Sequence, residues 1–199
     1  MNVACLDLEG VLLPEVWIAF ADAAGIPELR KTTRDEPDYD KLMRYRLEVL
    51  AEHGMTLPDI QAVAAKVDPL PGAKEFLDAL EKEISVIIVS DTFEQFAAPL
   101  MAKLGNPTIF CNSLVTDETG KIIDYKMRCE QSKLTTIKAL QSCGMEPICV
   151  GDSHNDLGMI LNGKTGFLFN TTEAIKQEYP QVPAFDNYDD LLEAIKAAR

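Results

Sequence analysis

The sequence predicts an α/β protein: a doubly wound, mainly parallel (Rossmann-like) sheet with helices on both faces and an inserted helical cap. Two observations predict the sheet, namely short apolar runs that recur along the chain and helical stretches that alternate with them. A third, an interval after the first strand that has helical patterns only, predicts the insert.

The predicted strands are continuous apolar runs, which are typical of parallel strands buried on both faces. They cover residues 3–8, 85–89, 108–111, 147–150 and 166–169, and the predicted helices cover 73–82, 93–104, 133–143, 154–161 and 191–198. Residues 114–127 have a turn between two extended segments, which indicates a hairpin.

The insert follows the first strand and has three helical stretches, 15–25, 39–53 and 57–67, with prolines near its ends at positions 14, 69 and 71. We expect a catalytic core of residues 1–14 and 72–199 and a helical cap of residues 15–71. A cap placed in this way can close over a site at the edge of the sheet.

Composition excludes several classes of protein. The chain has 199 residues, 47% of them hydrophobic and 26% charged, and a formal net charge of −13. No basic stripe is available for nucleic acid, and no apolar run approaches the roughly 20 residues that span a bilayer. The five cysteines are scattered without a CxxC pair, and the first residues do not form a signal peptide, so we expect a cytoplasmic location.

Acidic residues gather where two predicted strands end. Asp7 and Glu9 follow the first strand and, two residues apart in an extended segment, can face one pocket. Asp152 ends a later strand, and Asp156 lies about one helical turn beyond it. Four carboxylates at one rim repel each other unless a cation is bound, and all-oxygen ligands suit Mg²⁺.

Two further residues suit a phosphate group. Ser90 ends the second strand, where its hydroxyl and the following backbone N–H groups can hold phosphate oxygens. Lys133 lies at the start of a helix, where the helix dipole disfavours a cation, so a neighbouring anion would explain its position.

Together these motifs resemble those of the haloacid dehalogenase superfamily. Asp-Leu-Glu-Gly-Val at 7–11, Ser-Asp-Thr at 90–92, Lys133 and Gly-Asp-Ser-His-Asn-Asp at 151–156 stand in that superfamily's order and extend over nearly the whole chain. Within it the chain is similar to the phosphoserine phosphatase family. The cap entry at 14–20 and the loop at 32–40 look most like those of the bifunctional subgroup, whose members are also phosphoserine:homoserine phosphotransferases.

The resemblance implies a role for each motif residue. Asp7 is the nucleophile and Glu9 the acid/base, while Mg²⁺ is held by Asp7, Asp152 and the main-chain carbonyl of Glu9. Ser90 and Lys133 bind the phosphoryl oxygens and Asn155 orients the substrate. Asp156 braces the metal site or Lys133 from behind.

Two residues depart from ordinary phosphoserine phosphatases. Glu9 stands where aspartate is usual, and Asp91 stands where glycine is usual. Because a carboxylate would repel phosphate, we expect the side chain of Asp91 to point away and cap the next helix, leaving its backbone to bind substrate. Both departures match the bifunctional subgroup.

The cap is expected to bind the amino-acid end of phosphoserine. At about 100° per residue, Arg46 lies at about 40°, within the apolar arc of its helix, and Arg44 at about 200°, on the opposite face. A substrate carboxylate suits a guanidinium directed inward, although the side chain can also extend past the apolar residues to water. The resemblance also points to Arg46, and to Glu15 for the substrate ammonium group. Met43, near the face of Arg46 on the same helix, is expected to line the same pocket.

The sequence leaves other functions open. A phosphatase of another small phosphorylated metabolite, with water as sole acceptor, is the nearest alternative, and a non-catalytic receiver-like phospho-acceptor switch is the alternative from a different class. Halide hydrolysis would make little use of four clustered acids. The division between water and homoserine as acceptor is left open, and so is the oligomeric state, a homodimer included.

Overall fold

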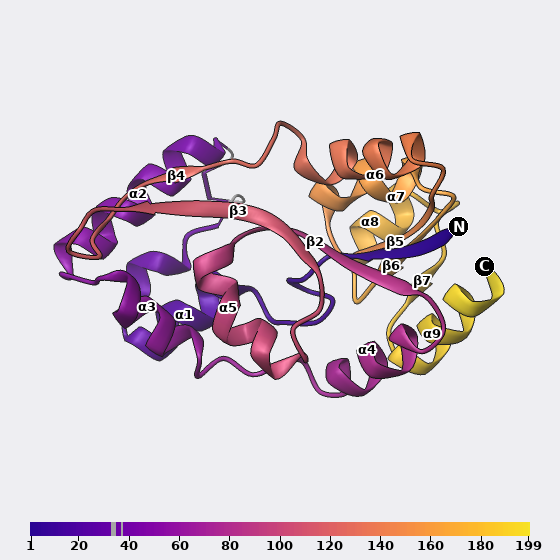
Figure 1. Ribbon diagram of the computed structural model, residues 1–199, viewed down its shortest axis with the longest axis horizontal. Coiled ribbons are helices and arrows are strands. Elements are labelled where there is room, and N and C mark those ends of the chain that lie inside the picture. Colours follow the sequence, from indigo (N-terminus) through magenta and orange to yellow (C-terminus); the bar gives the residue numbers. More distant parts are fainter. Residues whose placement is uncertain (33–34, 37) are drawn as a thin grey trace.

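The computed structural model describes residues 1–32, 35–36 and 38–199. Its centre is a seven-stranded sheet in the order β4-β3-β2-β1-β5-β6-β7 (Figure 1). All neighbouring strands are parallel except β3 and β4. The strands are β1 (Asn2–Leu6), β2 (Ser85–Phe93), β3 (Ile109–Thr116), β4 (Ile122–Lys126), β5 (Glu146–Gly151), β6 (Thr165–Phe169) and β7 (Ala184–Phe185).

Helices cover both faces of the sheet, which confirms the predicted doubly wound class (Figure 1). Side chains alternate between two cores along each strand: Cys5 faces α6 and α7, whereas Ala4 and Leu6 face the core that α4 and α9 close. This explains why the strands are apolar without interruption. The helices are α4 (Ala73–Glu81), α5 (Glu94–Lys103), α6 (Ser132–Ser142), α7 (Leu157–Asn162), α8 (Glu173–Glu178) and α9 (Tyr188–Ala197).

The segment between β1 and α4 is helical, as the sequence predicts. It contains α1 (Val16–Ala24), the 3₁₀ turn η1 (Pro27–Arg30), α2 (Tyr39–Glu52) and α3 (Leu57–Ala64). These helices also contact the core: the Leu57 N–H donates to the Gly120 carbonyl at 2.8 Å, in the turn of the β3–β4 hairpin. The division of the chain at 14/15 and 71/72 therefore stays a prediction.

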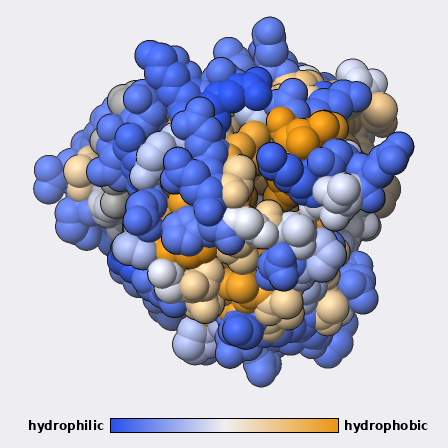
Figure 2. All heavy atoms as spheres, turned by 90° about the vertical axis from the view of Figure 1, so that its left-hand side faces the viewer, coloured by the Kyte–Doolittle hydropathy of each residue, from blue (hydrophilic) through white to orange (hydrophobic). Residues whose placement is uncertain are grey.

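The surface at the end formed by the inserted helices and the β3–β4 hairpin has both hydrophilic and hydrophobic side chains. Figure 2 shows mainly hydrophilic side chains around its perimeter and hydrophobic side chains that reach the surface nearer the middle. Among the exposed apolar residues, Ile123 lies on the edge strand β4 and is 52% exposed. None of the helices in the described part of the chain has the length and apolar character needed to cross a membrane.

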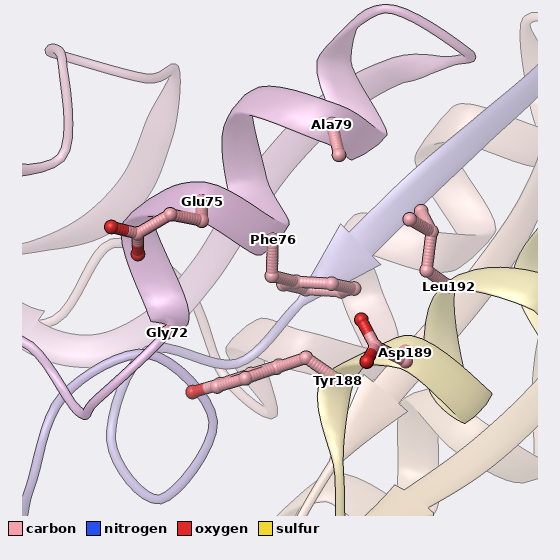
Figure 3. A pocket seen from close by; sticks show the side chains of 7 residues that line it. All are labelled: Gly72, Glu75, Phe76, Ala79, Tyr188, Asp189 and Leu192. Atoms are coloured by element: carbon pink, nitrogen blue, oxygen red, sulfur yellow. The ribbon is translucent and has the colours of Figure 1, made fainter.

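The carboxyl-terminal helix α9 closes the opposite end of the core against α4. Between them is a pocket of about 300 Å³ that none of the predicted site residues lines (Figure 3). The ring of Tyr188 lies between Phe76 and Phe169, at centroid distances of 4.9 and 4.7 Å. Its hydroxyl donates to the Val11 carbonyl at 2.7 Å, so α9 contacts the loop that follows β1.

The structure adds elements that the sequence pattern did not predict. Strand β7, helix α8 and turn η1 are short, and short elements carry little periodicity. Strand β2 also continues to Phe93, whereas the apolar run predicted an end at residue 89.

Candidate active site

The predicted site residues meet at the carboxyl ends of three neighbouring strands. Asp7 follows β1, Ser90 lies near the end of β2, and Asp152 follows β5. Strand β1 lies between β2 and β5: the chain passes from β1 to β2 on one side and reaches β5, on the other side, only after β4, so the strand order reverses next to β1. Ligands of open α/β sheets bind at such a point.

The centre of the site is a buried ion-pair network. The Nζ atom of Lys133 lies 2.8 Å from Asp7 Oδ1 and 2.6 Å from Asp156 Oδ1. All three side chains are at most 5% exposed. Asp156 also accepts hydrogen bonds at Oδ2 from the backbone N–H groups of Asp152 and Ser153, at 3.0 and 3.1 Å. Because both oxygens of Asp156 are engaged, its contacts agree with the expected bracing role.

Burial and charge shift the pKa values of these groups. Burial raises the pKa of Asp7 well above its usual range, and the nearby Asp156 carboxylate adds to this. Burial also raises the pKa of Asp152 to about 7, again with a contribution from Asp156. Burial alone would lower the pKa of Lys133, but the Asp7 and Asp156 carboxylates outweigh it and raise the pKa. A further cation nearby would stabilise the ionised forms of these carboxyl groups and lower their pKa values again.

The donor set fits a hard divalent metal ion. Asp7, Asp152 and Asp156 each offer a carboxylate oxygen, and these oxygens lie within 4.8 Å of one another. Gly10 makes room for this cluster: its φ is +77°, and a Cβ added there would lie 2.3 Å from Asp152 Cγ. Only glycine adopts this conformation readily and also leaves space for the carboxylate.

Glu9 lies at the entry to the helical segment. Its Oε2 accepts a hydrogen bond of 3.0 Å from the Val16 N–H, so it caps α1, where the N-cap residue Glu15 makes no side-chain cap. Burial raises the pKa of Glu9 to about 7, and the Glu15 carboxylate contributes. A carboxyl group with such a pKa can carry a proton near neutral pH.

Ser90 and Asp91 lie side by side at the end of β2, but the expected role of the Asp91 side chain is wrong. Among the described residues, none caps helix α5 with its side chain. The Asp91 carboxylate instead accepts a hydrogen bond of 2.5 Å from the Ser132 hydroxyl. Ser90 Oγ accepts from the Thr92 N–H at 3.2 Å, which leaves its own O–H available to a phosphoryl oxygen.

Arg46 points inward and Arg44 outward, as the helical geometry predicts. Arg46 is 6% exposed and packs over the Trp17 ring at 4.4 Å. Its Nη2 donates to the Lys31 carbonyl at 2.8 Å, and Nη1 lies 3.7 Å from Met43 Sδ. Its Nε is buried and has no hydrogen-bond partner among the described residues. Arg44 forms ion pairs with Asp124 and Asp40 at the surface.

The remaining predicted residues lie around the opening. Asn155 lines a cleft of about 400 Å³ together with Asp91 and Lys133. Glu15 is exposed, and its carboxylate is near enough to raise the pKa values of Glu9 and Asp152. The roles of both residues in substrate binding stay predictions. Of the 32–40 loop, residues Thr33, Arg34 and Pro37 lie outside the described residues.

Three residues of the site carried no recognisable signal in the sequence. Tyr39 lines the cleft, and its hydroxyl lies 3.4 Å from the Asp91 carbonyl. Ser132 and the buried Asn112 hold Asp91 from two other sides. Each contact joins residues at least 20 positions apart, which no local pattern can indicate.

Comparison with known proteins identifies the family. The family model of the haloacid dehalogenase-like hydrolases matches residues 1–163. A phosphoserine phosphatase of Pseudomonas syringae pv. tomato is 48% identical over all of this chain and 84% of its own length. Phosphoserine phosphatase ThrH of Pseudomonas aeruginosa is 48% identical over 96% of this chain and 93% of its own length.

Solved structures support the fold. A substrate-bound phosphoserine phosphatase complex superposes with a TM-score of 0.76 at 20% identity, covering 99% of this chain and 98% of that one. A phospho-aspartyl intermediate analogue of phosphoserine phosphatase gives 0.76 at 18% identity, covering 96% and 97%. The fold, the order of the site motifs and these matches lead to one assignment: the chain belongs to the haloacid dehalogenase-like hydrolases, in the group of the phosphoserine phosphatases.

Proposed function

We propose that this protein is a Mg²⁺-dependent phosphoserine phosphatase that works through an aspartyl-phosphate on Asp7. The observation that carries the proposal is the buried contact of Asp7 with Lys133, beside Asp152. A carboxylate nucleophile needs nearby positive charge to approach a phosphate dianion, and Lys133 supplies it. Asp7 is only 4% exposed, which argues against a receiver-like switch whose aspartate must be open to a kinase.

The phosphoryl group would be held by the residues around Asp7. Lys133 and the Ser90 hydroxyl bind its oxygens while a carboxylate oxygen of Asp7 attacks phosphorus and the bond to the serine oxygen breaks. The carboxylates of Asp7 and Asp152, with the Glu9 carbonyl, would hold Mg²⁺, which when bound neutralises charge on the phosphoryl oxygens. Asp156 keeps Lys133 in place.

Glu9 would handle the proton. It lies two residues from Asp7, at the entry to the cap, and its Val16 contact fixes its direction. In the first step it donates a proton to the departing serine oxygen. In the second it takes a proton from the water that attacks the aspartyl-phosphate, which regenerates Asp7 and releases inorganic phosphate.

Arg46 would bind the substrate carboxylate. Its guanidinium is buried and positively charged at neutral pH, and its Nε has no hydrogen-bond partner within the described part of the chain. Burial lowers the pKa of Arg46 only to about 10. A carboxylate that reaches the guanidinium would satisfy the orphaned donor, since the guanidinium fork matches carboxylate geometry. Glu15, at the mouth of the same region, would bind the ammonium group.

We further propose that homoserine accepts the phosphoryl group. Homoserine has the carboxylate and ammonium groups of serine and one more methylene before its hydroxyl. Arg46 and Glu15 can therefore hold it as they hold serine, and Glu9 can take its hydroxyl proton. An oriented hydroxyl competes with water because binding supplies its positioning entropy in advance.

Product analysis tests both levels of the proposal. Acid-quenched enzyme given ³²P-phosphoserine and Mg²⁺ should carry label on Asp7, and EDTA should abolish turnover. Label on serine or histidine, or full activity in EDTA, would contradict the mechanism. Millimolar homoserine should divert phosphate into O-phosphohomoserine, measured by mass spectrometry. Unchanged phosphate release without that product would leave a phosphatase with water as sole acceptor.

A further inference from the structure

Strand β2 has an irregular stretch where it reaches the active site. Val89 pairs with Phe110 of β3, but the next pair is Phe93 with Asn112. Between these pairs β2 therefore contains more residues than β3, and the extra length falls on Ser90, Asp91 and Thr92. Such bulges interrupt the regular ladder and redirect side chains, and they are common next to active sites.

The side chain of Asn112 replaces part of the interrupted ladder. It is 1% exposed, and its Nδ2 donates to the Asp91 carbonyl at 2.9 Å. The Asp91 carbonyl is part-buried and also lies 3.4 Å from the Tyr39 hydroxyl, and the shorter bond from Asn112 stabilises the irregular backbone in one conformation.

Asn112 also contacts the segment that leads to Lys133. Its Oδ1 accepts from the Arg128 N–H at 2.9 Å. A second link comes from Ser132, which directly precedes Lys133. The Ser132 hydroxyl donates to the Asp91 carboxylate at 2.5 Å. The two phosphate-binding elements, the β2 bulge and the start of α6, are thus joined through Asp91 by Asn112 and Ser132.

We propose that Asn112 is a positioning residue for phosphoryl transfer. By holding the Asp91 peptide and the segment before α6 at once, it sets the distance between Ser90 and Lys133, the two groups that contact the phosphoryl oxygens. Asn112 itself lies behind this surface and does not touch substrate. The inference rests on the proposed function only in requiring that the cleft binds a phosphoryl group.

The substitution Asn112→Asp tests this with little change in size. It keeps an oxygen for the Arg128 N–H but places a second oxygen against the Asp91 carbonyl. We expect kcat/KM to fall at least tenfold on phosphoserine and by a similar factor on p-nitrophenyl phosphate. The inhibition constant of inorganic phosphate, measured with Mg²⁺ present, should rise at least fivefold. The control Asn162→Asp loses a comparable bond, 2.8 Å from Nδ2 to the Gly158 carbonyl at the surface, and should stay within twofold of wild type.

The outcomes are distinct from those of the proposed function. If the wild type is inactive on phosphoserine but active on p-nitrophenyl phosphate, phosphoserine is not its substrate and the proposed function fails. The role of Asn112 is then tested by kcat/KM on p-nitrophenyl phosphate and by inhibition with inorganic phosphate. A lower melting temperature of Asn112→Asp with unchanged kcat/KM and phosphate inhibition would overturn the positioning role. If Asn112→Asp does not fold, Asn112→Ser removes the amide that contacts both the Asp91 carbonyl and the Arg128 N–H, and it should lower kcat/KM and weaken phosphate inhibition to a similar extent. Wild-type kinetics of Asn112→Ser would then reject the inference.

Discussion

The substitution Arg46→Ala separates substrate recognition from phosphoryl chemistry. In the structure Arg46 is buried over Trp17 and bonded to the Lys31 carbonyl, and its Nε has no partner among the described residues. If that guanidinium binds the substrate carboxylate, its removal should weaken the reaction of phosphoserine. A phosphate ester without a carboxylate should react nearly as before.

The contacts of Arg46 allow the two effects to be estimated. Burial outweighs the attraction of Tyr39, Glu9 and Glu15 and lowers the pKa of Arg46 to about 10, a net shift that corresponds to roughly 3 kcal/mol against the charged form. Its bond to the Lys31 carbonyl contributes about 1.5–3 kcal/mol and its stacking on Trp17 about 0.5–2 kcal/mol. These terms nearly cancel, so the free energy of unfolding should change by only about 1 kcal/mol. Loss of the buried contact to the carboxylate should cost about 2–4 kcal/mol in kcat/KM, or about 30-fold to 1,000-fold.

The assay compares kcat/KM for phosphoserine and p-nitrophenyl phosphate in three variants. Arg46→Lys keeps a charge without the planar fork and should fall between wild type and Arg46→Ala on phosphoserine. Arg44→Ala is the matched control, because Arg44 lies two residues away on the outer face and pairs with Asp124. Equal losses of Arg46→Ala on both substrates would show that Arg46 is structural, and the reasoning from its orphaned Nε would fail.

Four further predictions concern the acidic centre. Asp7→Asn should abolish turnover and leave the far-ultraviolet circular dichroism spectrum unchanged; residual turnover above about 1% would contradict the nucleophile assignment. Lys133→Met leaves Asp7 and Asp156 facing each other without their cation, so urea titration should show a loss of about 3–5 kcal/mol. Gly10→Ala places a methyl group against Asp152 at a strained φ, so isothermal titration should show Mg²⁺ binding weakened at least tenfold. The pKa of Asp152 is raised to about 7. Without metal, protonation of Asp152 therefore stabilises the folded state, and this stabilisation is lost as pH rises through 7. Mg²⁺ binds the carboxylate form, and the increase in Tm on adding it should therefore be larger at pH 7.5 than at pH 5.5, whereas an equal increase would contradict the shift.

Much of the site could be predicted because its residues are specified locally. The i and i+2 spacing of Asp7 and Glu9 follows from an extended backbone, and the inward direction of Arg46 follows from the period of α2. The uninterrupted apolar strands predicted a sheet buried on both faces, and in such a sheet the strand ends carrying Asp7, Ser90 and Asp152 meet at one edge. None of these predictions depends on contacts between residues that are far apart in the sequence.

The sequence by itself therefore determined the fold class, the rim where the acids gather and the inward face of α2. Only the tertiary structure decided the partners across that rim. Whether Asp91 capped α5 or bonded to Ser132 depended on where α6 docks, 41 residues along the chain. The role of Asn112 depended on the register shift between β2 and β3. Hydrogen bonds of this kind form only between atoms that packing has already brought within about 3 Å, and that packing is a property of the whole fold.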